Sequence, residues 1–222
     1  MTAPGAGGLL VVGGSGRTGG RVVAGLRAAG RPVSVLSRRP RPVPGVGAIT
    51  GDLGDPATWP AALEGIAGVA VSVEPPYDAE GAETVLHRGV AALAAAAADR
   101  GVRVVLVSQI YVTRPQAYPA MAHVTEARAR GEQALRASGA DCAVVRPGWL
   151  TDAPAGGVRL EQGDTGDGET SRDAVAAACV HLLLRPAGPP VTFELFDDPA
   201  APPVDWPAAV AALTPDAGAG RR

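Results

Sequence analysis

Residues 9–19 read LLVVGGSGRTG, a short apolar run followed by a glycine-rich turn and the start of an amphipathic segment. Glycines at positions 13, 16 and 19 let the chain turn sharply, let the backbone approach a pyrophosphate and let the next helix pack closely on the strand. The helix N-terminus then presents free N–H groups and the positive end of its dipole to phosphates. In a chain with 30 Gly the turn alone is weak evidence, but its place between a strand and a helix predicts a dinucleotide site.

Short apolar runs alternate with longer amphipathic segments from this turn to the end of the chain, which is the pattern of βα units on a parallel sheet. Strands are predicted at residues 9–12, 32–37, 48–50, 69–73, 103–108, 142–146 and 192–195. Helices are predicted at residues 18–29, 56–63, 80–100, 122–138, 171–184 and 205–213. We therefore expect a single α/β domain over residues 1–213, with a Rossmann-like, doubly wound parallel sheet and a disordered tail at 214–222.

The residues at the end of the second predicted strand indicate whether the cofactor is NAD or NADP. NAD-binding chains place an acidic side chain there, about 20 residues past the glycines, against the ribose 2′-hydroxyl. This chain has Arg38 and Arg39 instead, and their guanidinium groups can clamp a 2′-phosphate through charge-assisted bonds. Arg17, inside the glycine turn, adds a third positive charge. We therefore expect NADPH (NADP) rather than NADH; the alternative is that Arg38 and Arg39 are ordinary surface charges before a proline-rich loop.

The amino-acid composition excludes several catalytic mechanisms. The 20 basic residues are all Arg, and the chain contains neither Lys nor Asn, so a Schiff-base lysine, a P-loop lysine and a Tyr/Lys catalytic pair are impossible. A net charge of −2 argues against nucleic acid as a partner. Cys142 and Cys179 lack metal-ligand spacing, and no apolar run is long enough to span a membrane. We expect a cytoplasmic protein with reduced thiols and no metal site.

Further motifs follow the glycine turn in a specific order: residues 37–40 (SRRP), 51–53 (GDL), 138–150 (SGADCAVVRPGWL) and 171–176 (SRDAVA). Together they resemble the atypical short-chain dehydrogenase/reductases, and most closely their small NAD(P)H-binding, NmrA-like group, which includes flavin reductase and biliverdin reductase B. The resemblance spans nearly the whole chain. It implies a Rossmann fold with the cofactor at the carboxyl ends of the strands, and a small substrate lobe built from loops at residues 74–80, 109–123 and 149–170.

The resemblance also implies roles for single residues. The pyrophosphate would lie against Gly13, Ser15, Gly16, Arg17 and Thr18, and the 2′-phosphate against Arg38. Asp52 and Leu53 would flank the adenine, although Asp52 would serve equally well as a turn cap. Val73 and Glu74 would lie by the adjoining ribose, Ser108 beside the nicotinamide as a catalytic candidate, and Pro147 and Gly148 along the nicotinamide ribose and amide.

The usual proton donor of short-chain dehydrogenases is missing. A typical member uses a Tyr hydroxyl whose pKa is lowered by a Lys four residues on, but the matching positions hold Val124 and Arg128. Arg does not release a proton near neutral pH, yet it can hold ribose hydroxyls or an anionic substrate group. The remaining donor candidates are His123, at the start of the predicted helix, and Tyr111 and Tyr118, on the loop after the fifth strand. His123 could instead be a surface residue, and each tyrosine a pocket wall.

A conjugated substrate removes the need for an enzyme acid. When hydride enters a delocalised system such as a flavin, quinone or tetrapyrrole, the proton can come from water and the protein need only position two rings. We therefore predict an NADPH-dependent reductase of a small conjugated or carbonyl-containing molecule, acting as a monomer or homodimer. Two alternatives stay open: an NAD(P)H-sensing regulatory protein, and an isomerase, cyclase or dehydratase on the same fold.

Overall fold

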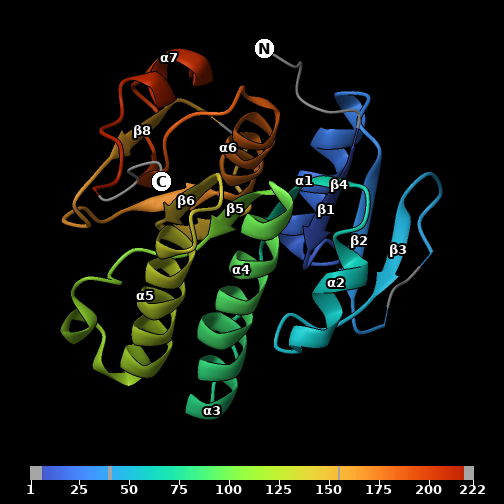
Figure 1. The fold of residues 1–222 in the computed structure, drawn as a ribbon. Helices are drawn as coiled ribbons and strands as arrows, with labels where there is room; N and C mark the ends of the chain where they lie inside the picture. The colour runs from blue at the N-terminus through green and yellow to red at the C-terminus, as the bar shows by residue number, and fades with distance from the viewer. Residues whose placement is uncertain (1–6, 40–41, 155, 218–222) are drawn as a thin grey trace.

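The molecule has a central β-sheet covered by helices on both faces (Figure 1). The computed structural model describes residues 7–39, 42–154 and 156–217. Within these residues the main sheet has eight strands in the order β3-β2-β1-β4-β5-β6-β10-β8. In chain order they are β1 (Gly8–Val12), β2 (Val33–Ser37), β3 (Gly47–Thr50), β4 (Ile66–Val71), β5 (Arg103–Val107), β6 (Cys142–Pro147), β8 (Val158–Glu161) and β10 (Val191–Asp197). All neighbours pair in parallel except β8 and β10, which are antiparallel.

Helices from different parts of the chain share each face of the sheet. The two faces carry α1 (Arg17–Ala28) and α6 (Arg172–Leu184) on one side, and α2 (Trp59–Ala62), α4 (Val90–Arg100) and α5 (Ala122–Ala137) on the other. The strand order reverses between β1 and β4, which opens a crevice at the carboxyl ends of the strands. This arrangement confirms the predicted doubly wound, Rossmann-like fold.

The helix expected at residues 80–100 is present but not uniform. It begins as α3 (Ala79–Ala82), passes through a π-helical stretch (Glu83–Gly89) and continues as α4. Gly89 lies in this stretch, and a Cβ at this position would collide with the carbonyl oxygen of Leu53. The glycine therefore lets the helix approach the loop after β3, one wall of the crevice.

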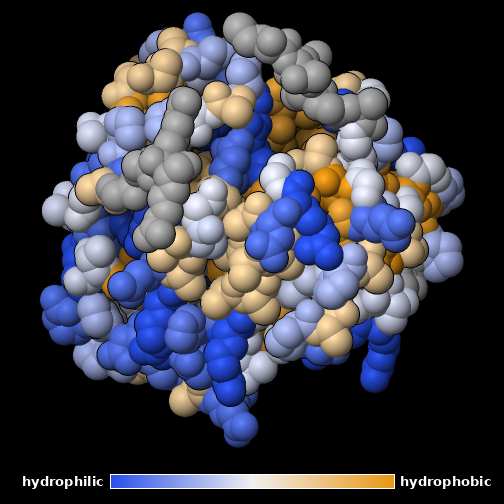
Figure 2. All heavy atoms as spheres, in the orientation of Figure 1, coloured by the Kyte–Doolittle hydropathy of each residue, from blue (hydrophilic) through white to orange (hydrophobic). Residues whose placement is uncertain are grey.

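The core is aliphatic because the strands are apolar along their whole length. In β5, all five residues are buried, and the two core clusters consist almost entirely of Val, Leu and Ala. On the face seen in Figure 2, hydrophilic residues gather over the lower part, around α3 and the loop before α5. In the part of the chain that the structure describes, no helix is both long and apolar enough to cross a bilayer. No cluster of three potential metal ligands occurs there either.

The segment at residues 149–170, expected to be a loop, contains three short strands. Two of them, β7 (Trp149–Thr151) and β9 (Glu169–Ser171), form a separate parallel pair. The third, β8, extends the main sheet by pairing with β10, from Glu194↔Glu161 to Asp197↔Val158. These strands were missed because each has only three or four residues, and their partners are remote in sequence. Between β8 and β9, residues 162–168 remain a loop.

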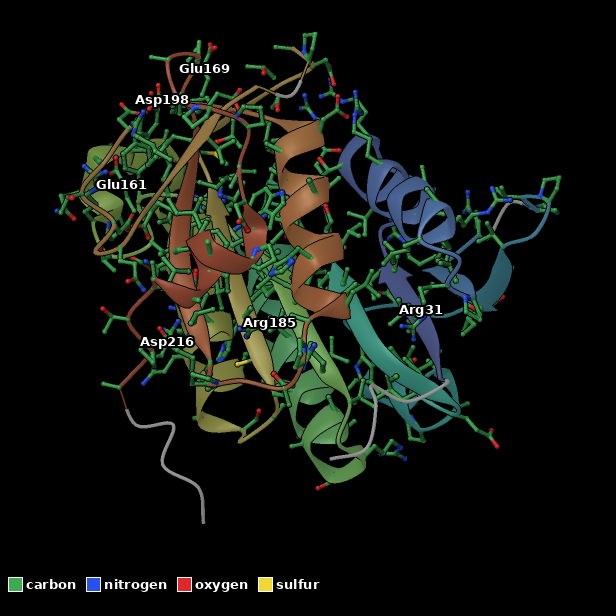
Figure 3. The ribbon with its side chains drawn as sticks, turned by 90° about the horizontal axis from the view of Figure 1, so that it is seen from above. Arg31, Glu161, Glu169, Arg185, Asp198 and Asp216 are labelled. Carbon is green, nitrogen blue, oxygen red and sulfur yellow. The ribbon has the colours of Figure 1, made fainter. Side chains whose placement is uncertain are left out.

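The tail expected from residue 214 is tied to the sheet at its start. The carboxylate of Asp216, labelled in Figure 3, accepts hydrogen bonds from the N–H and the hydroxyl of Thr192 in β10, at 3.1 and 2.8 Å. The N–H of Thr214 donates to Gln162 at 2.9 Å. The expectation of disorder is therefore wrong for residues 214–216, because these polar groups find partners at the edge of the sheet. Residues 218–222 lie outside the described part of the chain.

Candidate functional site

A groove of about 310 Å³ follows the carboxyl ends of β1, β2, β3 and β4. It is lined by eight of the residues assigned to the cofactor in the sequence: Gly13, Ser15, Gly16, Arg38, Asp52, Leu53, Val73 and Glu74. These residues come from four separate segments of the chain, each of which follows a strand. The parallel sheet brings them together because it places the carboxyl ends of all four strands at one edge.

The glycine turn has the shape that a pyrophosphate needs. Gly13 has a φ of 81°, and a Cβ there would collide with the carbonyl oxygen of Ser72. A Cβ at Gly19 would likewise collide with the carbonyl oxygen of Gly13. Helix α1 begins after Gly16, so no side chain caps its first N–H groups, and no acidic residue lies in its first turn. This uncapped helix N-terminus, open to the groove, fits an anionic group.

The two neighbouring arginines after β2 lie in different environments. Arg38 is exposed and lines the groove, and its guanidinium has no hydrogen-bond or ion-pair partner among the described residues. Arg39 is also exposed, but it does not belong to the lining found for the groove. Its backbone N–H donates to the Ser37 hydroxyl at 3.2 Å. Of these two arginines, only Arg38 therefore offers an unpaired positive charge directly to a ligand in the groove.

Asp52 caps a turn and also lines the groove. Its Oδ1 accepts from the N–H of Gly54 at 2.9 Å, which caps the turn after β3. It also lines the groove beside Leu53, which is buried. The carboxylate is therefore held in place by its own turn while it faces the cavity.

Two of the residues predicted to contact the pyrophosphate lie outside the groove lining. Arg17 points to the predicted substrate lobe, where its Nη1 donates to Asp152 at 3.1 Å. The same carboxylate meets Arg21 and Arg172, both at 3.2 Å. Thr18 is buried in the first turn of α1. A pyrophosphate contact to either residue would have to use the backbone N–H or, for Arg17, a rearranged side chain.

Ser108 and Arg128 line a second, much smaller cavity. It measures about 10 Å³ and shares Val73 with the groove. Arg128 is 8% exposed and donates to the carbonyl oxygens of Val107 at 3.2 Å and Val73 at 3.4 Å. Its guanidinium therefore spans the ends of β4 and β5, away from the groove in which a ribose contact was expected. Val124, in the place of the usual Tyr, packs against Leu86 in an apolar cluster.

Pro147 and Gly148 end β6 and are buried. The N–H of Gly148 donates to the carbonyl oxygen of Leu195 at 3.2 Å and to the Thr170 hydroxyl at 2.8 Å. A Cβ at Gly148 would collide with the carbonyl oxygen of Gly168. These two residues join the main sheet to the substrate lobe, and they are not part of the lining of either cavity described above.

Tyr111 and Tyr118 form an aromatic cluster with Trp149. The ring centroids lie 5.5 Å apart for the two tyrosines, 5.1 Å for Tyr118 and Trp149, and 6.2 Å for Tyr111 and Trp149. Tyr118 is 44% and Trp149 47% exposed, whereas Tyr111 is buried beneath them. The guanidinium of Arg114 lies 4.6 Å from the centre of the Tyr111 ring. The cluster joins the two predicted substrate loops at 109–123 and 149–170.

The backbone at Tyr111 is strained and held by one carboxylate. Tyr111 has a φ of 71°, which is rare for a residue with a side chain. Buried Asp164 accepts from the N–H groups of Tyr111 and Thr113, at 2.7 and 2.8 Å, and from the Thr113 hydroxyl at 2.9 Å. Burial and the Asp167 carboxylate raise the pKa of the Tyr111 hydroxyl above its usual value. This shift makes Tyr111 a weaker acid than a free tyrosine.

His123 ties the start of α5 to the loop after β4. Its Nε2 lies 2.8 Å from the carbonyl oxygen of Tyr77. A carbonyl can only accept, so Nε2 carries the proton in this contact. That hydrogen is therefore engaged within the protein rather than free for a substrate.

Several residues of the lobe were not singled out in the sequence. Trp149 and Asp164 come from the segment read as a loop, and Asp152 is the acceptor shared by three arginines. A tryptophan directly after Pro-Gly was a visible signal, because an exposed aromatic residue near a strand end often contacts ligands. No signal marked Asp164, whose role depends on contacts more than 50 residues away in sequence.

Residues 13–186 match the family described as NAD(P)H-binding. The chain belongs to this family. The match begins at the glycine turn and covers the three predicted substrate loops, and it agrees with the resemblance drawn from the motifs. Membership in the NAD(P)H-binding family indicates that the chain binds a nicotinamide dinucleotide.

A relative of this NAD(P)H-binding chain is the (4-alkanoyl-5-oxo-2,5-dihydrofuran-3-yl)methyl phosphate reductase of Streptomyces griseus, which is 34% identical over 189 residues. The aligned region is 79% of this chain but 62% of that relative, so the chain spans less than two thirds of its length. Among solved structures, a protein from Bacillus halodurans described as an NAD-dependent epimerase/dehydratase is 21% identical, with a TM-score of 0.80 over 92% of this chain and 99% of that one. The anaerobillin reductase ChuY of Escherichia coli O157:H7 is 24% identical, with a TM-score of 0.69 over 88% and 99%. These structures share the fold.

Proposed function

We propose that this protein is an NADPH-dependent reductase of a small, planar conjugated molecule. The observation that carries the proposal is the groove, in which an uncapped helix N-terminus and the unpaired Arg38 face one cavity. The helix N-terminus suits the pyrophosphate, and Arg38 suits a phosphate on the adenine ribose. The bound cofactor would supply hydride, and the chain would supply binding, orientation and electrostatics.

The aromatic cluster supports a conjugated substrate. Exposed Tyr118 and Trp149 offer ring faces next to the ends of β5 and β6, and flat ligands stack on such faces. Asp167 accepts from the Trp149 indole at 3.2 Å, which fixes the orientation of the ring. Two relatives named above are reductases, one of a dihydrofuranone phosphate. Substrate stacking would hold the acceptor carbon against the nicotinamide, so that proximity contributes a large share of the rate.

The proposal does not require an acid side chain. The Tyr111 hydroxyl has a raised pKa and the Nε2 hydrogen of His123 is engaged by a carbonyl. When the substrate is conjugated, the charge left by hydride arrival is delocalised, and solvent can deliver the proton. Tyr118, the remaining candidate, would act as a stacking surface.

The test is acceptor-dependent oxidation of NADPH by the purified protein. We expect turnover with quinones, flavins or conjugated furanones, and little with simple ketones. Trp149→Ala should raise KM for the acceptor while leaving the Kd for NADPH unchanged, because Trp149 belongs to the lobe and not to the groove. A protein that binds NADPH but turns over none of these acceptors would instead support the sensor alternative, and product formation without NADPH loss would support an isomerase, cyclase or dehydratase.

A further inference from the structure

The loop between β8 and β9, residues 162–168, runs from Glu161 to Glu169, both labelled in Figure 3. It contains three glycines and two aspartates, a composition that gives a loop little conformation of its own. Each of the two aspartates nevertheless accepts a hydrogen bond from a residue of the aromatic cluster described above. Contacts with that cluster therefore hold the loop in place.

Asp164 is a buried carboxylate that binds the chain at Tyr111. It is 1% exposed. Its Oδ1 accepts from the N–H of Tyr111 at 2.7 Å, and its Oδ2 accepts from the N–H and the hydroxyl of Thr113 at 2.8 and 2.9 Å. Because a buried carboxylate is costly without donors, these three hydrogen bonds fix the position of Tyr111 relative to the loop.

The backbone is strained at both ends of this contact. Among the residues that the structure describes, Tyr111 and Asp164 are the two non-glycine residues with a positive φ, of 71° and 56°. Such conformations persist only where the surrounding contacts enforce them, and they gather at functional sites. Here one hydrogen bond joins the two strained positions, although 53 residues separate them in the sequence.

The conformation of Tyr111 determines what the exposed rings of the cluster rest on. Its ring is buried, with its centroid 5.5 Å from that of Tyr118 and 6.2 Å from that of Trp149. Arg114 lies over the same ring and donates to the carbonyl oxygen of Gly166 in the loop. With a negative φ, the Tyr111 side chain would leave the backbone in another direction. Both exposed rings would then lose the surface beneath them.

Trp149 is held by the same loop. Its indole N–H donates to Asp167 at 3.2 Å, and its backbone N–H donates to the carbonyl oxygen of Gly168 at 2.9 Å. The loop thus holds two of the three rings, one through Asp164 and one through Asp167. Since the Tyr118 ring packs against both of them, the spacing of the whole cluster depends on the loop.

We propose that Asp164 is a positioning residue that determines which acceptors the reductase prefers, because it fixes the aromatic cluster. The inference rests on the proposed function, in which a planar acceptor lies on the exposed rings of Tyr118 and Trp149. An acceptor with two fused rings covers more of this surface than an acceptor with one ring, and contacts between rings depend on their spacing and tilt. Asp164 acts through the backbone of Tyr111 and not by contact with the acceptor.

The test compares a two-ring naphthoquinone with a one-ring benzoquinone as acceptors for the full chain. Asp164→Asn keeps the size of the side chain and suits a positive φ, but its single oxygen cannot serve all three donors. The ratio of kcat/KM for the two-ring acceptor to that for the one-ring acceptor should fall about 3- to 10-fold, the worth of one aromatic contact. The Kd for NADPH should not change. An equal loss for both acceptors, or no loss, would overturn the inference.

Two further variants keep the test sharp, even where Asp164→Asn does not fold. Thr113→Val removes the hydroxyl donor and leaves both N–H donors in place, so the same ratio should fall about 2-fold. Glu169→Gln removes an exposed carboxylate next to the loop and should leave the ratio unchanged. An unchanged ratio in Thr113→Val, or a fall in Glu169→Gln as large as in Asp164→Asn, would contradict the role of Asp164.

Fluorine NMR of protein labelled with fluorotryptophan supplies a readout that needs no acceptor. The chain has three tryptophans, and Trp149→Phe assigns one signal. Asp164→Asn should shift the Trp149 signal alone, whereas a general loss of packing would also shift the signal of Trp59, which lies in the core. A Trp149 signal that does not respond would overturn the inference.

The two readouts separate this inference from the proposed function. If the wild type turns over neither quinone while Asp164→Asn shifts the Trp149 signal alone, the proposed function fails and the control of the cluster by Asp164 stands. If turnover occurs and the ratio for the two acceptors is the same in Asp164→Asn as in the wild type, this inference alone fails.

Discussion

At the scale of single residues, two adjacent arginines differ in their position relative to the groove. Arg38 lines it with an unpaired guanidinium, whereas its neighbour Arg39 lies outside the lining. A side chain that already has no internal partner can bind a phosphate without breaking an existing ion pair. Arg17 is in the opposite situation, because it is already bound to Asp152.

Arg38→Glu should weaken NADPH binding about 10- to 100-fold and leave NADH binding nearly unchanged, since one charge-assisted interaction contributes about 1.5–3 kcal/mol. Titration of each cofactor against the variant measures both Kd values. Arg39→Glu is the matched control, with the same charge change one residue away and a much smaller expected effect. Equal losses for both cofactors, or equal effects of the two variants, would defeat the assignment of Arg38 to the 2′-phosphate.

At the scale of elements, the short C-terminal helix α7 (Trp206–Ala211) packs on α6 through a histidine. The rings of His181 and Trp206 are stacked, with centroids 6.4 Å apart and planes inclined by 22°. Burial and Arg185 lower the pKa of His181, while Asp205 opposes the shift. The folded protein therefore resists protonation of this ring more than the unfolded chain does.

The stability of this contact should depend on pH. Below the unfolded pKa of about 6.5, the unfolded chain binds more protons than the folded one, so stability falls as pH decreases toward the lowered folded pKa. Melting curves of the wild type at about pH 7.5 and 5.5 should show a lower Tm at the acidic pH. In His181→Phe, which keeps a ring against Trp206 and cannot titrate, the difference should shrink. An unchanged difference in the variant would assign the effect to other groups.

At the scale of the whole molecule, a buried ionic network joins the helix layer, the sheet and the substrate lobe. Arg146 in β6 donates to Glu132 of α5 at 2.6 Å and to Glu194 of β10 at 3.0 Å. Glu194 also accepts from the N–H of Asp164, the residue that holds the strained Tyr111 loop. Both glutamates are at most 1% exposed. Three successive contacts, Arg146–Glu194, Glu194–Asp164 and Asp164–Tyr111, therefore connect β6 to the aromatic cluster.

Glu132→Ala should destabilise the protein by about 3–5 kcal/mol, because it leaves the buried Arg146 charge partly unpaired. Urea unfolding monitored by circular dichroism measures the free energy of unfolding. The matched control is Glu132→Leu/Arg146→Met/Glu194→Gln, which removes all three buried charges, keeps an acceptor for the N–H of Asp164, and should recover part of that loss. A single variant that loses less than about 1 kcal/mol, the range of exposed ion pairs, would show that the network contributes little.

The nucleotide half of the fold followed from local patterns. The glycine turn and the strand–helix alternation predicted the sheet and the position of the turn, and the arginines after β2 predicted Arg38, because each signal lies within a few positions of the residue it concerns. Val73 and Glu74 were predicted only by the family resemblance. The match to the NAD(P)H-binding family confirms the class of the fold and of the ligand. The roles of individual groove residues stay predictions.

The structure of residues 149–171 was harder to predict because it depends on contacts with remote parts of the chain. Strands β7, β8 and β9 are too short for their own periodicity to mark them, and they exist because partners elsewhere in the chain satisfy their backbone groups. The Tyr111 conformation depends in the same way on Asp164, which no local pattern connects to it.

The absence of Lys and Asn is a property of the sequence, and it determined that a Tyr/Lys pair cannot operate here. The sequence likewise determined where the dinucleotide turn lies, because a turn and a helix start depend on neighbouring residues. Only the tertiary structure decided which polar side chains lie together near the positions of the missing pair. Arg128 and Ser108 are 20 positions apart in the chain, and they face one cavity because α5 packs across the ends of β4 and β5.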